Sequence, residues 1–186
     1  MPTPDLPPQT LAPIALPALS PDLLERPLDY FMADHDRQRA VCAYLKQAVR
    51  LERIDRVSAR AISGFLAGDL KQHFDDERLS LYPALLSRST DDVEFSLSIR
   101  HIERLHAGSE GMVDYLIEHL QRLAKRNVTH LSPEFSELLL EYARQEQQSL
   151  AFENSVILAI AGVRLKKSDL GRISADMKAR RGMVVP

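Results

Sequence analysis

Residues 73–83 read HFDDERLSLYP, and two side chains of this stretch fall where a buried helix face should be apolar. At about 100° per residue, the helix predicted over residues 58–86 gathers its apolar side chains into one arc. His73 and Glu77, one turn apart, lie at the centre of that arc. Because an unpaired carboxylate is costly to bury, these two positions predict a polar site inside the helical core.

The chain around this helix is predicted to be helical as well. From residue 28 to residue 162 the only prolines are Pro83 and Pro133, and β-branched residues are sparse. Ser132 followed by Pro133 is a start signal for a helix. Four long antiparallel helices with short links predict an all-α fold, an up-down-up-down four-helix bundle followed by a short C-terminal helix. The predicted helices cover residues 27–51, 58–86, 91–125, 132–162 and 168–181.

The arcs of the other three long helices also hold ionisable side chains. At about 1.5 Å per residue, these and the first two fall about 12–24 Å from one end of the predicted bundle and form one layer. A single inward histidine is more often a hydrogen-bonded core residue. Three histidines and three carboxylates with few inward Lys or Arg partners instead favour a metal site, with donors that suit iron or manganese. The predicted ligands are His35, His73, Glu77, His106, Glu146 and Glu153.

Composition excludes several classes of protein. The 186 residues carry 24 Lys and Arg against 26 Asp and Glu, a net charge of −2, so no basic field favours nucleic acid or a membrane surface. The single cysteine, Cys42, excludes a disulfide scaffold and fits a reducing compartment. Residues 6–21 are uncharged but hold five prolines, which argues against a spanning helix or a signal peptide. We therefore expect a soluble, cytoplasmic protein.

The two ends of the chain differ from the predicted bundle, which covers residues 28–162. Residues 1–27 hold eight of the eleven prolines and lack helical periodicity, so we expect a mobile, disordered arm. Residues 163–186 hold seven Lys or Arg and two Asp residues, a net charge of +5. A solvated helix end, favoured by the helix dipole, is the first interpretation of this basic tail. Contact with the acidic bundle or with an acidic partner is the alternative.

The stretch HFDDERLSLYP resembles the H-x-x-x-E-x-x-x-x-[FY]-P signature of the hemerythrin-like, HHE cation-binding proteins. The resemblance extends over about residues 28–162. DYFMADHDRQRAVCAYL resembles the first helix of that family, with His35 as its ligand, and RLHAGSE matches the third helix, with His106. The tail SDLGRISADMKARRG resembles the terminal helix of bacterial stand-alone members. The resemblance implies a four-helix bundle with a non-haem di-iron centre.

The fourth helix departs from the family signature. Its sequence SLAFENSVILAIA keeps Glu153, but Ser149 occupies the histidine position and Ala159 the proline position. Glu146, about one turn before Ser149, is a candidate replacement for the lost imidazole. A site with a single metal ion and a site that has been lost are the alternatives.

The resemblance implies that the protein binds O₂ reversibly, senses O₂, NO or iron, or stores metal. The implied cofactor is one or two non-haem iron ions, with manganese or zinc as alternatives, and the implied partner is a small diatomic ligand. Neither nucleic acid nor a membrane is an expected partner, and a protein partner remains open. A metal-poor helical interaction module is the second interpretation. A di-iron oxidase or peroxidase-like enzyme is ranked last, because no substrate pocket can be identified from the sequence.

Overall fold

The computed structural model describes residues 11–126 and 130–183, and this part of the chain contains helices and no β-strand. The predicted all-α fold is confirmed for these residues. Four long helical rods follow one another along the chain. The first rod is α1 (Pro27–Arg50), and the third is α5 (Val93–Leu123).

The second and fourth rods are composed of several segments. The second contains α2 (Arg56–Phe65), η2 (Leu66–Leu70), α3 (Lys71–Asp76), η3 (Glu77–Leu81) and α4 (Tyr82–Ser87). The fourth contains α6 (Pro133–Phe152), η4 (Glu153–Leu158) and α7 (Ala159–Arg164). A short 3₁₀ helix, η1 (Pro21–Glu25), precedes the first rod, and α8 (Lys167–Arg180) follows the fourth.

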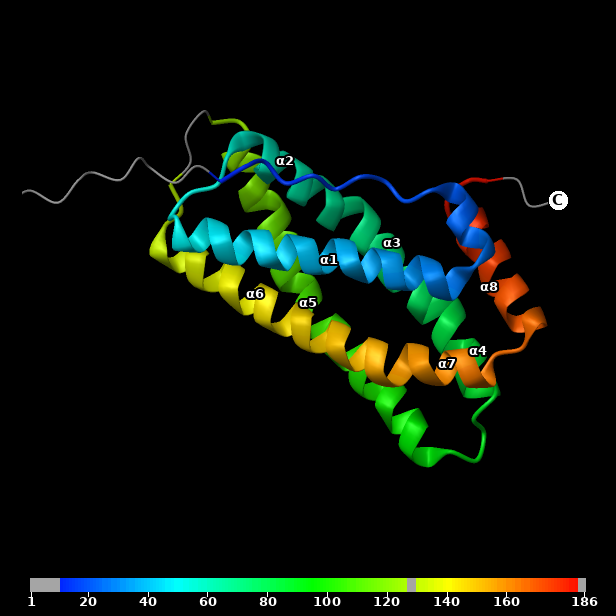
Figure 1. The fold of residues 1–186 in the computed structure, drawn as a ribbon. Coiled ribbons are helices and arrows are strands. Elements are labelled where there is room, and N and C mark those ends of the chain that lie inside the picture. The colour runs from blue at the N-terminus through cyan, green and yellow to red at the C-terminus, as the bar shows by residue number, and fades with distance from the viewer. Residues whose placement is uncertain (1–10, 127–129, 184–186) are drawn as a thin grey trace, which may run out of the picture.

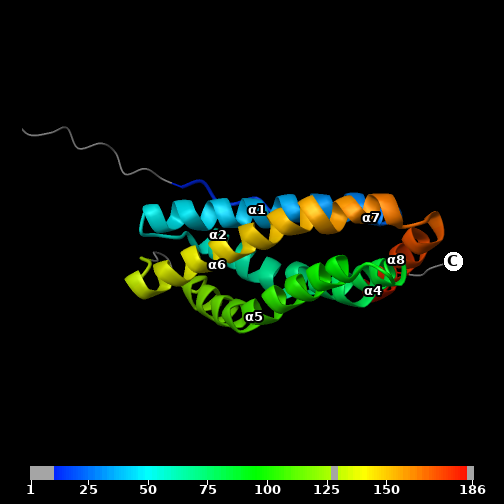
Figure 2. The same cartoon turned by 90° about the horizontal axis from the view of Figure 1, so that it is seen from below.

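The four rods lie lengthwise beside one another, and α8 lies across one end of them (Figure 1). Most contacts between rods join α1 to α6 and α2 to α5. Figure 2 shows α1 with α6 and α7 on one side of the molecule and α4 with α5 on the other. In the described residues, no helix combines the length and the apolar character needed to cross a membrane.

Side-chain caps determine where the third and fourth rods begin. Ser132 accepts a hydrogen bond from the backbone N–H of Phe135 at 3.2 Å, which confirms the predicted start of the fourth rod. The third rod begins at Val93 and not at residue 91, because Asp92 is its cap and accepts from the backbone N–H of Phe95 at 2.9 Å.

Within residues 11–126 and 130–183, three stretches of π-helix interrupt the regular α-helical turns, namely η2, η3 and η4. Glu77 is the first residue of η3, and Glu153 is the first residue of η4. A π turn closes its hydrogen bond over one extra residue, so projection at a uniform angle does not predict it. Two of the three carboxylates of the predicted layer, Glu77 and Glu153, therefore lie where the helical turn widens, which is a frequent property of functional sites.

Two apolar clusters fill the core, one on each side of the predicted polar layer. On the second rod, His73 and Glu77 lie between Leu70 of one cluster and Leu81 of the other. On the third rod, His106 lies between Ile102 and Val113 in the same way. The core is thus continuous along each rod except at the depth of these polar side chains.

The prediction of a free N-terminal arm is wrong for residues 11–26. Leu24 is 1% exposed, and Leu11, Ile14 and Leu16 pack against the core. The backbone N–H of Ile14 donates to Ser58 Oγ at 3.0 Å. The segment runs along the bundle to η1 (Figure 1), and its apolar residues reach the core while the prolines between them stay exposed. Residues 1–10, the rest of the predicted arm, lie outside the described residues.

The interpretation of the basic tail as a solvated helix is also wrong. Ile173 and Met177 of α8 are buried in the core. Arg180 Nε lies 2.6 Å from Asp76 Oδ1, and an Arg181 Nη atom lies 2.7 Å from Asp76 Oδ2. The alternative, contact with the acidic bundle, is therefore the one that the structure shows. Its physical reason is the fully buried carboxylate of Asp76, which needs positive partners.

The burial of Leu24 can be tested by shortening its side chain. Leu24→Ala is expected to lower the free energy of unfolding by about 2–4 kcal/mol, because it leaves a cavity between η1 and the bundle. Leu140→Ala is the matched control, since Leu140 is largely exposed on α6. Urea denaturation followed by circular dichroism measures both. Equal losses in the two variants would contradict the packing of this segment.

Candidate metal centre

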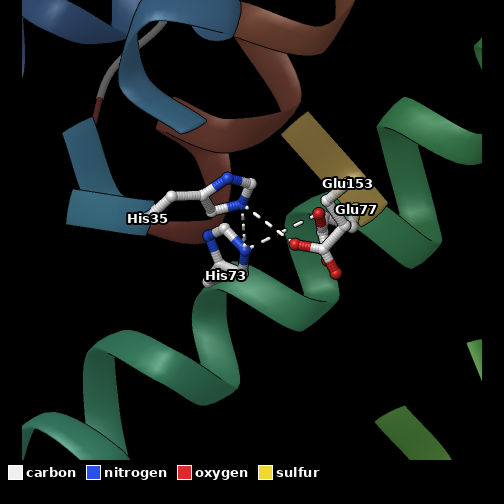
Figure 3. Close-up of side chains that lie close together, drawn as sticks. All are labelled: His35, His73, Glu77 and Glu153. Atoms are coloured by element: carbon white, nitrogen blue, oxygen red, sulfur yellow. Dashed lines mark hydrogen bonds and ion pairs between the residues drawn. The ribbon is translucent and has the colours of Figure 1, made fainter. Parts of the chain in front are cut away.

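Four buried side chains with metal-binding groups converge inside the bundle. They are His35 from α1, His73 from α3, Glu77 from η3 and Glu153 from η4. One nitrogen or oxygen donor of each lies within 4.8 Å of the donors of the other three. Figure 3 shows the two imidazole rings facing the two carboxylates. Three of the four rods therefore supply one compact group of donors.

Short distances connect these side chains to one another and to His106 of α5. His35 Nε2 lies 3.3 Å from His73 Nε2 and 3.2 Å from Glu153 Oε2. His73 Nε2 lies 3.6 Å from Glu77 Oε1. His106 Nε2 lies 2.7 Å from Glu153 Oε1, and its Nδ1 lies 3.6 Å from Glu77 Oε2. Five of the six predicted ligands thus lie together, and all four rods contribute.

Glu77 has an unsatisfied carboxylate. Both of its oxygens are buried, and neither accepts a hydrogen bond of normal geometry from a described residue. The Tyr82 hydroxyl group is near enough to lower the pKa of Glu77, but it too is buried without such a hydrogen bond. A buried carboxylate without donors is rare because its desolvation is not compensated. A metal ion would compensate it, so the residues present fit a bound cation.

The charges of the group are strongly coupled. Burial raises the pKa of Glu77, and the neighbouring Glu153 raises it further. Burial also acts on His73, but the carboxylates of Glu77 and Asp34 outweigh it and raise the pKa of His73 to about 10. Burial, together with the positive charge on His73, lowers the pKa of His35 to about 4. Without a metal ion, the carboxylates raise the pKa values of His73 and His106 against the effect of burial, whereas burial and the charge of His73 lower that of His35.

A comparison with protein families agrees with this chemistry. A family model described as the hemerythrin HHE cation binding domain matches residues 26–161. The chain belongs to this family. Searches among curated proteins and among solved structures returned no match. The His and Glu group therefore lies inside a domain of a cation-binding family.

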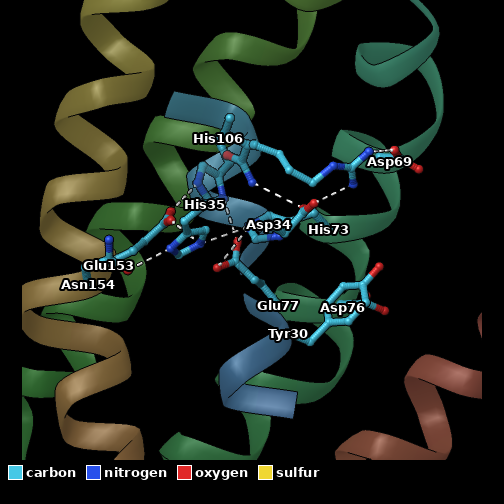
Figure 4. Close-up of polar contacts among 12 residues, drawn as sticks. Tyr30, Asp34, His35, Asp69, His73, Asp76, Glu77, His106, Glu153 and Asn154 are labelled. Atoms are coloured by element: carbon cyan, nitrogen blue, oxygen red, sulfur yellow. Dashed lines mark hydrogen bonds and ion pairs between the residues drawn. The ribbon is translucent and has the colours of Figure 1, made fainter. Parts of the chain in front are cut away.

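Two imidazoles of the HHE domain each have a polar side chain beside ring nitrogen Nδ1, while Nε2 lies toward the other donors. His73 Nδ1 lies 3.1 Å from Asp34 Oδ2, and Asp34 Oδ1 accepts from an Arg37 Nη atom at 2.9 Å. Arg37 also pairs with Asp69 at the surface. His73 Nδ1 has no hydrogen bond of normal geometry, so Asp34 acts on the ring through its charge. In the neutral imidazole that a metal ion needs, this carboxylate would favour the proton on Nδ1 and leave the lone pair of Nε2 toward the centre. Figure 4 draws Asp34, His73 and Asp69 among the polar contacts around the centre.

His35 is oriented in the same way by a neutral group. Asn154 Oδ1 lies 2.8 Å from His35 Nδ1, and Asn154 follows Glu153 directly in the chain (Figure 4). Neither Asp34 nor Asn154 was predicted from the sequence. Each is the immediate neighbour of a predicted ligand, which could have pointed to it, but each falls outside the apolar arc of its helix.

Glu146 is the predicted ligand that lies apart from the other five. It is buried on α6, and it forms no hydrogen bond or ion pair with the described residues. Burial, with the negative charge of Glu153, raises its pKa to about 7. A pocket of about 30 Å³ between α5 and α6 is lined by Glu146, Ser149 and Ser109, among others. The space beside Ser149 therefore contains a carboxylate without a partner.

The role of Asp34 can be tested by removing its charge while keeping its shape. Asp34→Asn is expected to weaken Fe²⁺ binding about tenfold or more, because His73 loses the carboxylate that orients it. Asp36→Asn is the matched control, since Asp36 is exposed on the same helix and pairs only with Arg39 in the described residues. Anaerobic titration with Fe²⁺ measures the two affinities. An affinity of Asp34→Asn equal to that of the control would contradict the role.

Proposed function

We propose that this HHE domain binds one or two non-haem iron ions and presents them to a small diatomic ligand, O₂ or NO. The observation that carries the proposal is the group of three imidazoles and two carboxylates in which Glu77 is buried and unsatisfied. Bound ferrous iron would supply an open coordination position and an electron for such a ligand. The role of the protein's own residues is to bind the iron, to orient the side chains that bind it and to exclude water.

The arrangement of the carboxylates supports a centre with two ions. Glu77 has one oxygen toward His73 and the other toward His106, at 3.6 Å each. Glu153 has one oxygen toward His35, at 3.2 Å, and the other toward His106, at 2.7 Å. Each carboxylate thus lies between two imidazoles. In this proposal His35, His73 and His106 would be terminal ligands, and Glu77 and Glu153 would bridge or chelate the ions, within an up-down-up-down bundle.

We further infer that Glu146 substitutes for the imidazole that Ser149 lacks. Glu146 precedes Ser149 by about one turn and lines the same small pocket. Its carboxylate is buried without a partner, and binding to a metal ion would remove the penalty of that burial. Manganese or zinc also binds mixed imidazole and carboxylate donors, so metal identity is decided by analysis of the purified protein.

The proposal predicts loss of iron from two variants. His73→Ala and Glu77→Ala are each expected to weaken iron binding by about tenfold or more while helix content stays nearly unchanged. Metal analysis, the visible spectrum and circular dichroism measure this. His101→Ala is the matched control, because His101 is an exposed histidine of α5. Unchanged iron content in both variants contradicts the ligand assignment. A wild-type protein that takes up no iron would instead support the metal-poor interaction module.

A second prediction concerns the fourth rod. Ser149→His restores an imidazole one turn before Glu153, so it is expected to raise the iron content toward two ions per chain. The larger side chain is expected to destabilise the metal-free protein by about 1–3 kcal/mol. Glu146→Ala is expected to lower the iron content. Anaerobic iron titration compares the three proteins. Equal binding of two ions by all three would show that neither position is a ligand.

A further inference from the structure

A pocket of about 250 Å³ lies between α3 and α5, outside the metal centre. Leu70, Phe74 and Val113 supply its apolar lining. The charged side chains around it are largely neutralised by pairs, such as Lys71 with Asp114 at 2.9 Å and Arg78 with Asp75 at 2.7 Å. A neutral diatomic molecule loses little hydration in such a pocket, whereas an ion would lose much.

Phe74 separates this pocket from the metal centre. Its ring lines the pocket and stacks on His106, with 4.3 Å between ring centroids and 25° between ring planes. The Phe74 ring also lies near the His73 ring, with 6.0 Å between the two ring centroids. His106 is 8% exposed, whereas His35, His73, Glu77 and Glu153 are each 1% exposed or less. The side of the centre nearest to solvent is therefore the side that Phe74 covers.

The position of Phe74 in its helix allows its ring to move. Phe74 belongs to the six-residue α3, which lies between the π-helical stretches η2 and η3. Its ring forms no polar contact and is held only by the stacking on His106 and by packing against the first apolar cluster. Rotamer changes of partly exposed side chains are fast compared with most ligand-binding steps. The pocket on the opposite side of α5 has a volume of only about 30 Å³ and is lined by the carboxylate of Glu146. It suits a water molecule better than a neutral gas.

We propose that the pocket between α3 and α5 is the entrance for a small uncharged ligand, and that Phe74 is the gate between this entrance and the metal centre. The proposal rests on the proposed function for the identity of the ligand. The access route itself does not depend on iron.

The accessibility of the gate to O₂ can be measured directly, because the chain contains no Trp. Phe74→Trp places the sole tryptophan of the 186-residue chain at the gate, and Phe152→Trp places it at a partly buried position outside the pocket. Quenching of fluorescence by dissolved O₂ and by iodide is compared in the presence of Zn²⁺. We expect O₂ to quench the tryptophan at position 74 several-fold faster than that at position 152, and iodide to quench it poorly. Slower or equal quenching by O₂ at position 74 overturns the entrance.

The gate is tested on the iron-loaded protein. Phe74→Ala is expected to raise both the association and the dissociation rate constants of NO by about tenfold, with the equilibrium dissociation constant nearly unchanged. Phe74→Leu is expected to have a smaller effect in the same direction and serves if the alanine variant does not fold. Leu79→Ala, on the exposed side of η3, is the control. Stopped-flow spectroscopy gives the rates, and metal analysis gives the iron content.

The outcomes distinguish the two proposals. Rapid quenching at position 74, in a protein whose iron binds no diatomic ligand, supports the entrance and contradicts the proposed function. Unchanged NO rates in Phe74→Ala and Phe74→Leu overturn the gate. A changed equilibrium constant with unchanged association rate also overturns it, because Phe74 would then support His106 and not control access.

Discussion

The burial of two carboxylates beside three imidazoles is the constraint on which the rest of this structure depends. Glu77 and Glu153 are removed from water, and each needs positive charge or hydrogen-bond donors in return. Imidazoles from three rods supply part of that compensation, and the remaining deficit is concentrated on Glu77. A helix bundle can keep such a layer only if the apolar clusters on both sides are large enough to hold the rods together. The two clusters in this HHE domain meet that requirement.

The compensation continues outward from the centre. Asp34 stabilises the positive charge on His73, and Arg37 in turn balances Asp34 and reaches Asp69 at the surface. Alternating charges of this kind hold each group in one orientation, because every member would lose a partner by moving. His35 has only the neutral Asn154 behind it, which agrees with its lowered pKa. The centre is therefore asymmetric, because the pKa values of His73 and His106 are raised whereas that of His35 is lowered.

Much of this arrangement could be predicted from the sequence, because helical periodicity places residues on faces and caps mark helix starts. His73 and Glu77 were found in this way, and so was the start of the fourth rod at Ser132. The π stretches could not be found, since they break the uniform angle on which the arcs depend. Asp34 and Asn154 were missed for a different reason, because each lies one residue away from a predicted ligand, and uniform helical spacing puts such a neighbour about 100° away from it.

The errors at the two ends have a different cause. Proline content indicates that a segment is not helical, but it does not indicate whether the segment is free. Residues 11–20 form no helix and lead into the short η1, yet residues 11–26 still place apolar side chains against the core. A short apolar or basic segment docks only if the folded bundle has a complementary surface. Such a surface is formed by tertiary structure and is therefore not visible in the segment's own sequence.

The ion pairs of Asp76 with Arg180 and Arg181 bear on where this domain ends as a folding unit. Asp76 immediately precedes Glu77, and its carboxylate is fully buried. The family match ends at residue 161, so a polypeptide cut there would lack both arginines together with the buried Ile173 and Met177. Asp76 would then be a second uncompensated carboxylate next to the metal centre. The packed structure is thus longer than the stretch that the family model matches, and a fragment designed to keep these buried contacts should extend through residue 181.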